Sequence, residues 1–301
     1  MGEYVQNMDT WLDMARERVR SRQPAQLSMF EVFAAEAKFG RQWLDDSLAG
    51  LRPGANVLEV GAGLMLLACQ LRREGYAVTA LEPIGEGFSI FSRVQDLVLD
   101  LAREQGFAPD VRGVPVEALH DETRFDLAYS VNVMEHVADV ETAIAAVVAV
   151  LAPGGRYRFT CPNYRFPYEP HFNIPTLFSK RLTERMLGSR IFGNRRMDDP
   201  AGVWRSLNWI DVGRVRRACA RLEGVVPHFR RGLLVKTLSR LACDPEFANR
   251  RAAWMRGLGR LLVASGGHRL AGLIPAGMQP IIDCELVKSG GLRVNSAGGR
   301  A

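Results

Sequence analysis

The stretch ANVLEVGAGLMLLACQLRREGYAVTALEP (residues 55–83) contains the pattern that decides the fold. A short apolar run at each end has the length and composition of a buried strand, and the residues between them have helical spacing. Gly61 and Gly63 fall in the turn after the first strand, where a missing Cβ permits a tight turn and a close approach of a ligand. Glu82 ends the second strand, where a carboxylate can accept hydrogen bonds from both ribose hydroxyls of an adenosine. This order predicts a nucleoside-binding βαβ unit.

The alternation of apolar strands and helices continues on the C-terminal side of this unit. Such an alternation is typical of a parallel sheet that is covered by helices on both faces. We therefore predict an α/β, Rossmann-like, doubly wound fold with a mostly parallel seven-stranded sheet, an antiparallel last strand, a helical N-terminal extension and a C-terminal helical insertion. The five further strands are expected at 111–116, 125–133, 154–162, 225–232 and 279–288.

Changes of pattern divide the chain into parts. Helical spacing dominates the N-terminal residues, and a later helix is expected to end at Gly188. The tail is rich in glycine and serine, so we expect it to be disordered. The predicted parts are an N-terminal helical cap (1–50), a cofactor-binding Rossmann-like domain (51–233), a basic amphipathic helical insertion (234–278), the last strand (279–289) and the tail (290–301).

The nucleoside is not expected to be a dinucleotide. The dinucleotide pattern needs a third glycine at position 66, which is leucine here. Glu59, two residues before the first glycine, would repel a pyrophosphate but would attract an ammonium group. The turn therefore favours a nucleoside that carries a positive charge.

The residues resemble those of class I S-adenosylmethionine-dependent methyltransferases, in particular those that methylate small molecules such as quinone precursors. VLEVGAGLM (57–65) resembles their first motif, with Met65 where the last glycine often stands, and FDLAYSVNVMEHVADV (125–140) and LAPGGRYRFTCPN (151–163) continue the resemblance. The resemblance covers about residues 55–165 and implies that the cofactor is S-adenosylmethionine.

The same resemblance implies a place for each cofactor-binding residue. Glu59 and the turn would lie near the methionine part, Glu82 would bind the ribose, Val116 and Glu117 would flank the adenine, and Ser130 would lie beside the cofactor. The implied cofactor-binding residues are Glu59, Gly61, Ala62, Gly63, Glu82, Pro83, Val116, Glu117 and Ser130.

VMEHV (133–137) lies where the resemblance places the transferred methyl group. His136 could take the proton of an attacking hydroxyl, since an unperturbed pKa of about 6.5 suits general base catalysis, and Glu135 precedes it. In quinone-type relatives this Glu-His pair, with an acid three residues earlier, can hold a divalent metal. That position is Asn132 here, so we assign no metal ligands. The alternative is that His136 only orders the loop.

CPNYRFPYEPHFNIP (161–175) follows the fifth strand and therefore leaves the edge of the sheet where ligands bind. Its prolines stiffen the loop, which lowers the entropy lost when it encloses a substrate. His171 is a second candidate base, and the candidate substrate contacts are Asn163, Tyr164, Tyr168 and Glu169. The alternative is a plain connector whose phenylalanines anchor it in the core.

The C-terminal third is strongly basic. Residues 214–269 contain thirteen Arg or Lys and three acids, which gives 13 − 3 = +10, and leucines alternate with the arginines at helical spacing. Such a face can lie on an anionic membrane or cover a core as an ordinary solvated lid. Few aromatic residues accompany the arginines, so nucleic acid is an unlikely partner. An interior helix of this kind is not long or apolar enough to span a membrane.

Composition and motifs together predict the function. The N-terminus has no secretory signal and the five cysteines form no close pair, so we expect a cytoplasmic protein, peripheral to the membrane if the basic face binds lipid. We predict a methyltransferase that acts on a small-molecule or lipid-linked acceptor, with O-methylation favoured. The alternative is a non-catalytic cofactor- or partner-binding module that keeps the fold.

Overall fold

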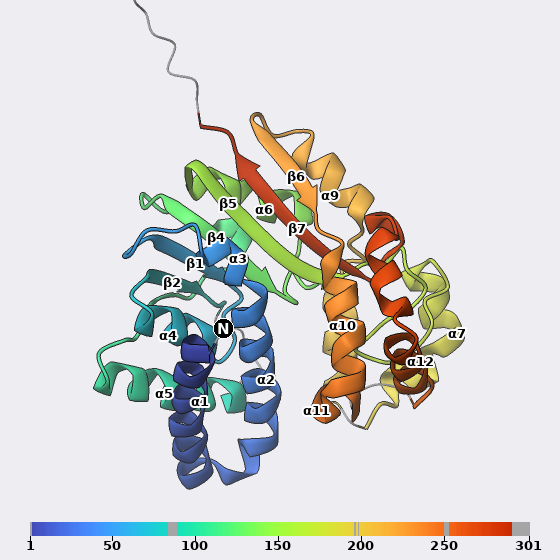
Figure 1. The fold of residues 1–301 in the computed structure, drawn as a ribbon, viewed down its shortest axis with the longest axis horizontal. Coiled ribbons are helices and arrows are strands. Elements are labelled where there is room, and N and C mark those ends of the chain that lie inside the picture. Colours follow the sequence, from blue (N-terminus) through green and yellow to red (C-terminus); the bar gives the residue numbers. More distant parts are fainter. Residues whose placement is uncertain (1, 84–88, 196, 198, 250–252, 291–301) are drawn as a thin grey trace, which may run out of the picture.

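The fold is that of a computed structural model, which describes residues 2–83, 89–195, 197, 199–249 and 253–290. Seven strands form one twisted sheet in the order β3-β2-β1-β4-β5-β7-β6 (Figure 1). The first five run parallel, and β7 is antiparallel to both of its neighbours. The predicted sheet is confirmed, with strands β1 (Asn56–Val60), β2 (Ala77–Leu81), β3 (Asp110–Arg112), β4 (Phe125–Val131), β5 (Leu151–Pro162), β6 (Val225–Phe229) and β7 (Ile281–Lys288).

Helices cover both faces of the sheet because its central strands are apolar on both. In β1, Val57 belongs to one buried cluster and its neighbour Leu58 to the other, as the alternation of side chains along a strand requires. One cluster includes helices α1 (Gly2–Arg22), α2 (Leu27–Trp43), α4 (Leu66–Arg73) and α5 (Ser89–Glu104). The other includes α6 (Val140–Val150), α8 (Pro200–Ser206) and α9 (Val212–Cys219).

Buried polar contacts fix the N-terminal helices to the sheet. The indole nitrogen of Trp11 donates to the carbonyl of Leu66 at 3.0 Å. Arg158 of β5 is 3% exposed, forms an ion pair with Asp283 of β7 at 3.1 Å and donates to the carbonyl of Trp43 at 2.8 Å. Short helix α3 (Asp45–Leu48) is held by the same arginine. Helix α2 is therefore held rigidly beside the carboxyl ends of the strands.

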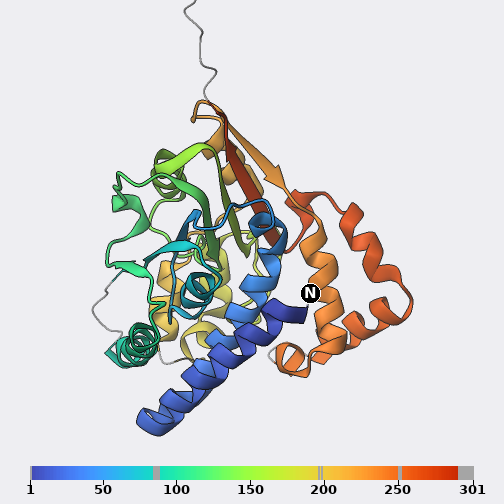
Figure 2. The same ribbon diagram turned by 60° about the vertical axis from the view of Figure 1, so that its left-hand side comes forward.

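The C-terminal insertion lies between the last two strands, as the sequence predicts. It contains α10 (Gly232–Cys243), α11 (Pro245–Asn249), α12 (Ala253–Ala264), η3 (Gly267–Leu273) and η4 (Ala276–Met278). Figure 2 shows these helices as a lobe that stands out from the sheet beside β6 and β7. No helix in the described part of the chain is long and apolar enough to cross a membrane.

The end of helix α7 differs from the sequence prediction. Helix α7 (Lys180–Phe192) continues past Gly188 and ends before Gly193, so the predicted end at Gly188 is wrong. The reason is that the bonds of the last turn reach Gly193, whose N–H donates to the carbonyl of Ser189 at 3.1 Å. The predicted disordered tail, apart from residue 290, lies outside the described residues.

Candidate active site

The glycine turn after β1 is built on left-handed backbone. Gly61 and Gly63 have φ values of +72° and +52°, which side chains rarely allow. A Cβ on Gly61 would lie 2.4 Å from Cγ2 of Val133, so the space beside this glycine is filled by the loop after β4. A Cβ on Gly63 would lie 3.1 Å from the ring of Phe33 of α2. The turn is thus enclosed by protein on two sides.

Met65 shows how the first motif departs from its usual form. The residue has a φ of 62°, so the chain keeps the left-handed conformation that the motif's last glycine would adopt. Its side chain is fully buried, in the cluster that includes α1 and α2. Packing of this side chain therefore compensates for a backbone strain of roughly 1–2 kcal/mol.

Glu82 lies at the end of β2 and contacts the turn directly. Its Oε2 accepts a hydrogen bond from the backbone N–H of Gly63 at 2.7 Å. Burial raises the pKa of this carboxyl above its ordinary value. A carboxylate has about four acceptor positions, so this bond leaves capacity for ribose hydroxyls. Pro83 follows it and is exposed.

Glu59 lies within β1, two residues before the turn, and is 6% exposed. Its Oε2 has no hydrogen-bond partner within the described residues, and burial raises the pKa of the carboxyl to about 8. A buried acid with an unpaired oxygen is costly unless a ligand completes it. The ammonium group of S-adenosylmethionine is a fitting partner, so the residues present fit this cofactor. Ala62, in the turn itself, is almost fully buried.

The remaining predicted cofactor residues have partners within the protein. Val116 is buried in the core and Glu117 accepts a hydrogen bond from the backbone of Asp139 at 3.1 Å. The hydroxyl of Ser130 lies 3.0 Å from that of Tyr157 in the core. The side chain of Ser130 is therefore occupied within the core.

Two separate segments bring four ionisable side chains together beyond the strands. His136 follows β4 and His171 lies in the loop after β5, and their ring centroids are 5.2 Å apart. Glu135 and Glu169 are both fully buried. Both carboxylate oxygens of Glu135 lack a partner within the described chain, and burial raises its pKa to about 7.

Hydrogen bonds fix the tautomers of both histidines. Glu169 Oε1 lies 2.6 Å from Nδ1 of His171, so Nδ1 carries the proton and Nε2 is an acceptor. The hydroxyl of Ser206 donates to the carbonyl of Val203 and therefore accepts from Nδ1 of His136 at 2.8 Å. In its neutral form each imidazole thus offers an unprotonated Nε2.

The two histidines differ in basicity. Burial and the neighbouring His171 lower the pKa of His136 to about 4. Burial also acts to lower the pKa of His171, but the hydrogen bond and charge of Glu169 outweigh it, so the net shift is upward. His171 is therefore the stronger base, although the sequence favours His136.

Glu135, His136 and His171 could also hold a divalent cation. One ligand atom from each lies within 4.8 Å of those of the other two. Two imidazoles and a carboxylate form a donor set that suits several divalent transition metals. The sequence assigned no ligands because Asn132 replaces an acid, and it did not show that His171 from another loop lies beside Glu135 and His136.

The predicted substrate contacts of the proline-rich loop mostly hold the loop itself. Asn163 is 1% exposed and its amide donates to the carbonyl of Gln279 at 2.7 Å. Tyr164 is buried, stacks on Trp209 and lies 3.3 Å from Glu169. The hydroxyl of Tyr168 bonds Asn173 at 2.6 Å within the loop. We therefore interpret Asn163 and Tyr164 as supports for Glu169 and His171, a role that combines both sequence alternatives.

Sequence reasoning missed three residues that face this site from other segments. Glu36 of α2 lies close enough for its charge to raise the pKa of both Glu135 and His171. Phe33 of the same helix covers Gly63, and Ser206 of α8 bonds His136. Phe33 and Glu36 lie three residues apart and hence on one helix face. The hydrophobic periodicity of this segment predicts a helix, but it does not indicate that this face belongs to a functional site.

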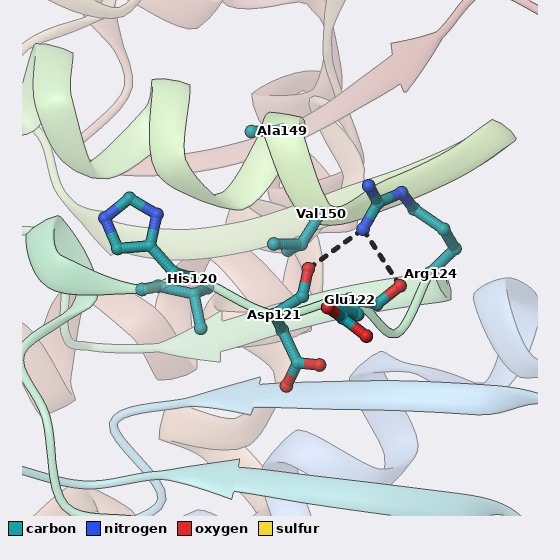
Figure 3. A pocket seen from close by; sticks show the side chains of 7 residues that line it. His120, Asp121, Glu122, Arg124, Ala149 and Val150 are labelled. Atoms are coloured by element: carbon teal, nitrogen blue, oxygen red, sulfur yellow. Dashed lines mark hydrogen bonds between the residues drawn. The ribbon is translucent and has the colours of Figure 1, made fainter.

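A concavity of about 380 Å³ is lined by residues such as His120, Glu122 and Arg124 (Figure 3). It lies at the start of β4, and thus at the opposite end of the strands from the ligand edge. Arg124 donates there to the main-chain carbonyls of Asp121 and Glu122. These bonds stabilise a surface turn, and the pocket shares no residue with the site described above.

The fold and the site define a class I S-adenosylmethionine-dependent methyltransferase, and S-adenosylmethionine is its cofactor. Residues 33–197, more than half of the chain, match the family model described as a methyltransferase domain, and the chain belongs to this family. It is 49% identical over 281 residues to the uncharacterized protein Rv1509 of Mycobacterium tuberculosis, covering 93% of this chain and 95% of that protein.

More distant similarities agree with this assignment. The ubiquinone biosynthesis O-methyltransferase of Paramagnetospirillum magneticum is 34% identical over 197 residues, covering 58% of this chain and 75% of that protein. A putative sarcosine dimethylglycine methyltransferase from Galdieria sulphuraria is similar in fold, with a TM-score of 0.50, 18% identity, and coverage of 85% of this chain and 88% of that one. The resemblance to methyltransferases expected from the motifs is thus confirmed.

Proposed function

We propose that the protein transfers a methyl group to a hydroxyl of a small-molecule or lipid-linked acceptor, with His171 as general base. The observation that carries this proposal is the hydrogen bond of 2.6 Å between Glu169 and Nδ1 of His171, which leaves Nε2 free to accept a proton. A buried carboxylate that holds an imidazole in this tautomer also stabilises the imidazolium that forms. The similarity to a ubiquinone biosynthesis O-methyltransferase supports oxygen as the atom methylated.

The site divides the chemistry between the cofactor and the chain. Bound S-adenosylmethionine supplies an electrophilic methyl group; Glu59, Glu82 and the turn at Gly63 would hold it. The acceptor oxygen would lose its proton to Nε2 of His171 as it takes the methyl group, whose bond to the sulfonium sulfur would break to leave S-adenosylhomocysteine. Val133 contacts the glycine turn and lies three residues before His136, so the turn is packed against the loop that carries His136.

His136 is assigned a positioning role in place of the base that the sequence favours. With a pKa near 4, its imidazole is neutral at pH 7 but a weak proton acceptor. Its bond to Ser206 connects the loop after β4 to α8. Its free Nε2 can accept a hydrogen bond from the acceptor molecule and so orient that molecule. Tyr168 and its neighbours in the loop would enclose the same molecule.

The acceptor has to be found before these roles are tested. We would incubate the enzyme and a deuterated-methyl cofactor with metabolite and lipid extracts, and search for labelled products by mass spectrometry. His171→Asn should lower kcat by about two to four orders of magnitude with cofactor affinity unchanged. His136→Asn should raise KM more than it lowers kcat, and the opposite pattern would return the base to His136.

The pH profile separates a base from a structural residue. Activity should rise with pH through the raised pKa of His171, because only the neutral imidazole accepts a proton. Glu169→Gln should move this limb to lower pH, since the largest upward contribution to the pKa is lost. Cofactor binding without a labelled product in any extract would favour the non-catalytic module. Calorimetric heat with NAD but none with S-adenosylmethionine would reject the function altogether.

A further inference from the structure

The insertion between β6 and β7 carries an exposed apolar surface. We call this the leucine surface, and its members are Leu258, Leu261, Leu270, Leu273, Ile274 and Met278. Four of them, Leu261, Leu270, Leu273 and Met278, are 65–72% exposed. A run of large apolar side chains this accessible marks an interaction surface more often than an ordinary solvated face.

The surface is separate from the part of the insertion that packs on the protein. Helix α12 packs through Gly259, where a Cβ would lie 2.9 Å from the side chain of Leu241 in α10. Leu258 and Leu261 are three residues apart, so they share a different face of α12. Helices α10 and α12 both contact η3, which carries Leu270 and Leu273. These contacts hold the insertion together, and α12 makes its contact with α10 on a face other than that of Leu258 and Leu261.

The charge around this surface has one sign. No Asp or Glu occurs between Glu246 and Asp283, while that segment contains Arg250, Arg251, Arg256, Arg260 and Arg269. Arg260 and Arg269 are exposed, and neither forms an ion pair with a carboxylate of the described residues. Exposed leucines with unpaired arginines and no acid complement an anionic surface with an apolar interior.

We infer that the leucine surface docks on anionic lipid bilayers. Residues 247–282, which include the segment that would meet the lipid, contain no Asp or Glu. Leucines would enter the boundary between headgroups and acyl chains, and the arginines would meet the lipid phosphates. Each engaged cation strengthens the partition coefficient about fivefold at low salt.

The insertion that carries the leucine surface contacts the start of the proline-rich loop. The side-chain amide of Asn163 donates to the carbonyls of Gly277 and Gln279 at 3.2 and 2.7 Å, and its backbone N–H donates to Pro280. Asn163 begins the loop that carries His171. A bilayer that meets Met278 would therefore bring its headgroups to the same loop, and a lipid-linked acceptor follows if the proposed methyl transfer is correct.

Sedimentation with vesicles tests the docking without any acceptor. We expect the full-length protein to pellet with phosphatidylcholine vesicles that contain about one third phosphatidylglycerol at low salt, and little with phosphatidylcholine alone. Because the Debye length shortens from about 30 Å at 0.01 M to about 8 Å at 0.15 M salt, binding should weaken over this range. The double variant Arg260→Gln and Arg269→Gln should lower partitioning about twentyfold. The double variant Arg52→Gln and Arg103→Gln removes the same charge from other elements, so it is the control and should leave partitioning unchanged.

Serine substitutions test the leucines. The triple variant Leu261→Ser, Leu273→Ser and Met278→Ser should lower partitioning at least tenfold, and Met186→Ser on α7 is a control of similar exposure. Cofactor affinity should stay unchanged in every variant, which separates this result from failure of methyl transfer. Absence of pelleting, equal binding to neutral vesicles, or an unaffected triple variant would overturn the inference. So would concentration-dependent self-association that the triple variant abolishes without any vesicle binding, since the surface would then join two copies of the chain.

Discussion

Replacement of Glu82 tests the cofactor site most directly. Its carboxylate is the acceptor for the backbone N–H of Gly63 at 2.7 Å, and its remaining acceptor positions face the place expected for the ribose. Glu82→Ala removes charge-assisted hydrogen bonds worth about 1.5–3 kcal/mol in total binding, which corresponds to a roughly ten- to hundredfold weaker Kd. Glu82→Gln keeps the shape and one acceptor oxygen, so it should fall near the lower end of that range.

Isothermal titration with S-adenosylhomocysteine is the appropriate assay, because no acceptor or turnover is required. Glu122→Gln is a matched control, since this exposed glutamate lies at the other end of the strands in the pocket of Figure 3. Because burial raises the pKa of Glu82, binding to the wild-type protein should weaken as the pH falls through that raised pKa, and the pH dependence should be smaller in Glu82→Gln. An unchanged Kd in a correctly folded Glu82→Ala protein would refute the assignment of the ribose to this residue.

Two stability predictions concern the framework of the site, and both are measured by urea unfolding. Gly61→Ala should lower the free energy of unfolding by about 2–5 kcal/mol, from left-handed strain of about 1–2 kcal/mol and overpacking against Val133 of about 1–3 kcal/mol. Gly54 has a φ of +74° and nothing within 4 Å of an added Cβ, so Gly54→Ala should cost the strain alone. Equal losses in the two variants would contradict the close contact with Val133. Arg158→Met should cost about 3–5 kcal/mol because Asp283 is 4% exposed and would lose its partner. Adding Asp283→Leu should recover much of that loss, and a double variant as unstable as the single one would refute the argument.

The sheet and the glycine turn could be predicted because their signals are local. Apolar runs of strand length, a turn that contains Gly61 and Gly63, and an acid at Glu82 each follow from a few neighbouring residues. The helix end at Gly188 was wrong because a glycine costs an interior helix only about 1 kcal/mol, which packing can offset. The glycine turn after β1 also differs from the expected one. The side chain of Val133, rather than a ligand, occupies the space where a Cβ on Gly61 would lie.

The base could not be assigned from the sequence because it depends on contacts between distant segments. His136 and His171 are 35 positions apart, and only their mutual contact and the bond from Glu169 show that their pKa values move in opposite directions. The charge of Glu36, which raises the pKa of Glu135, comes from α2. The sequence predicts this helix only as part of a helical cap. A list of ionisable residues in a loop therefore identifies the site but not the role of each member.

The segments that we propose to face the acceptor lie outside the βαβ unit proposed to hold the cofactor. Gly63 and Glu82 belong to the βαβ unit, whereas Glu36, Ser206 and His171 come from α2, α8 and the proline-rich loop. Two of these segments are fixed by buried polar contacts: Arg158 holds the end of α2, and Asn163 holds the loop against the C-terminal insertion. The family match over residues 33–197 includes Glu36 and His171 but not Ser206, so the similarity supports the cofactor while the acceptor stays a proposal. The insertion that carries the leucine surface contacts Asn163 at the start of the same loop, so a bilayer docked there would present a lipid-linked acceptor from the side of that loop.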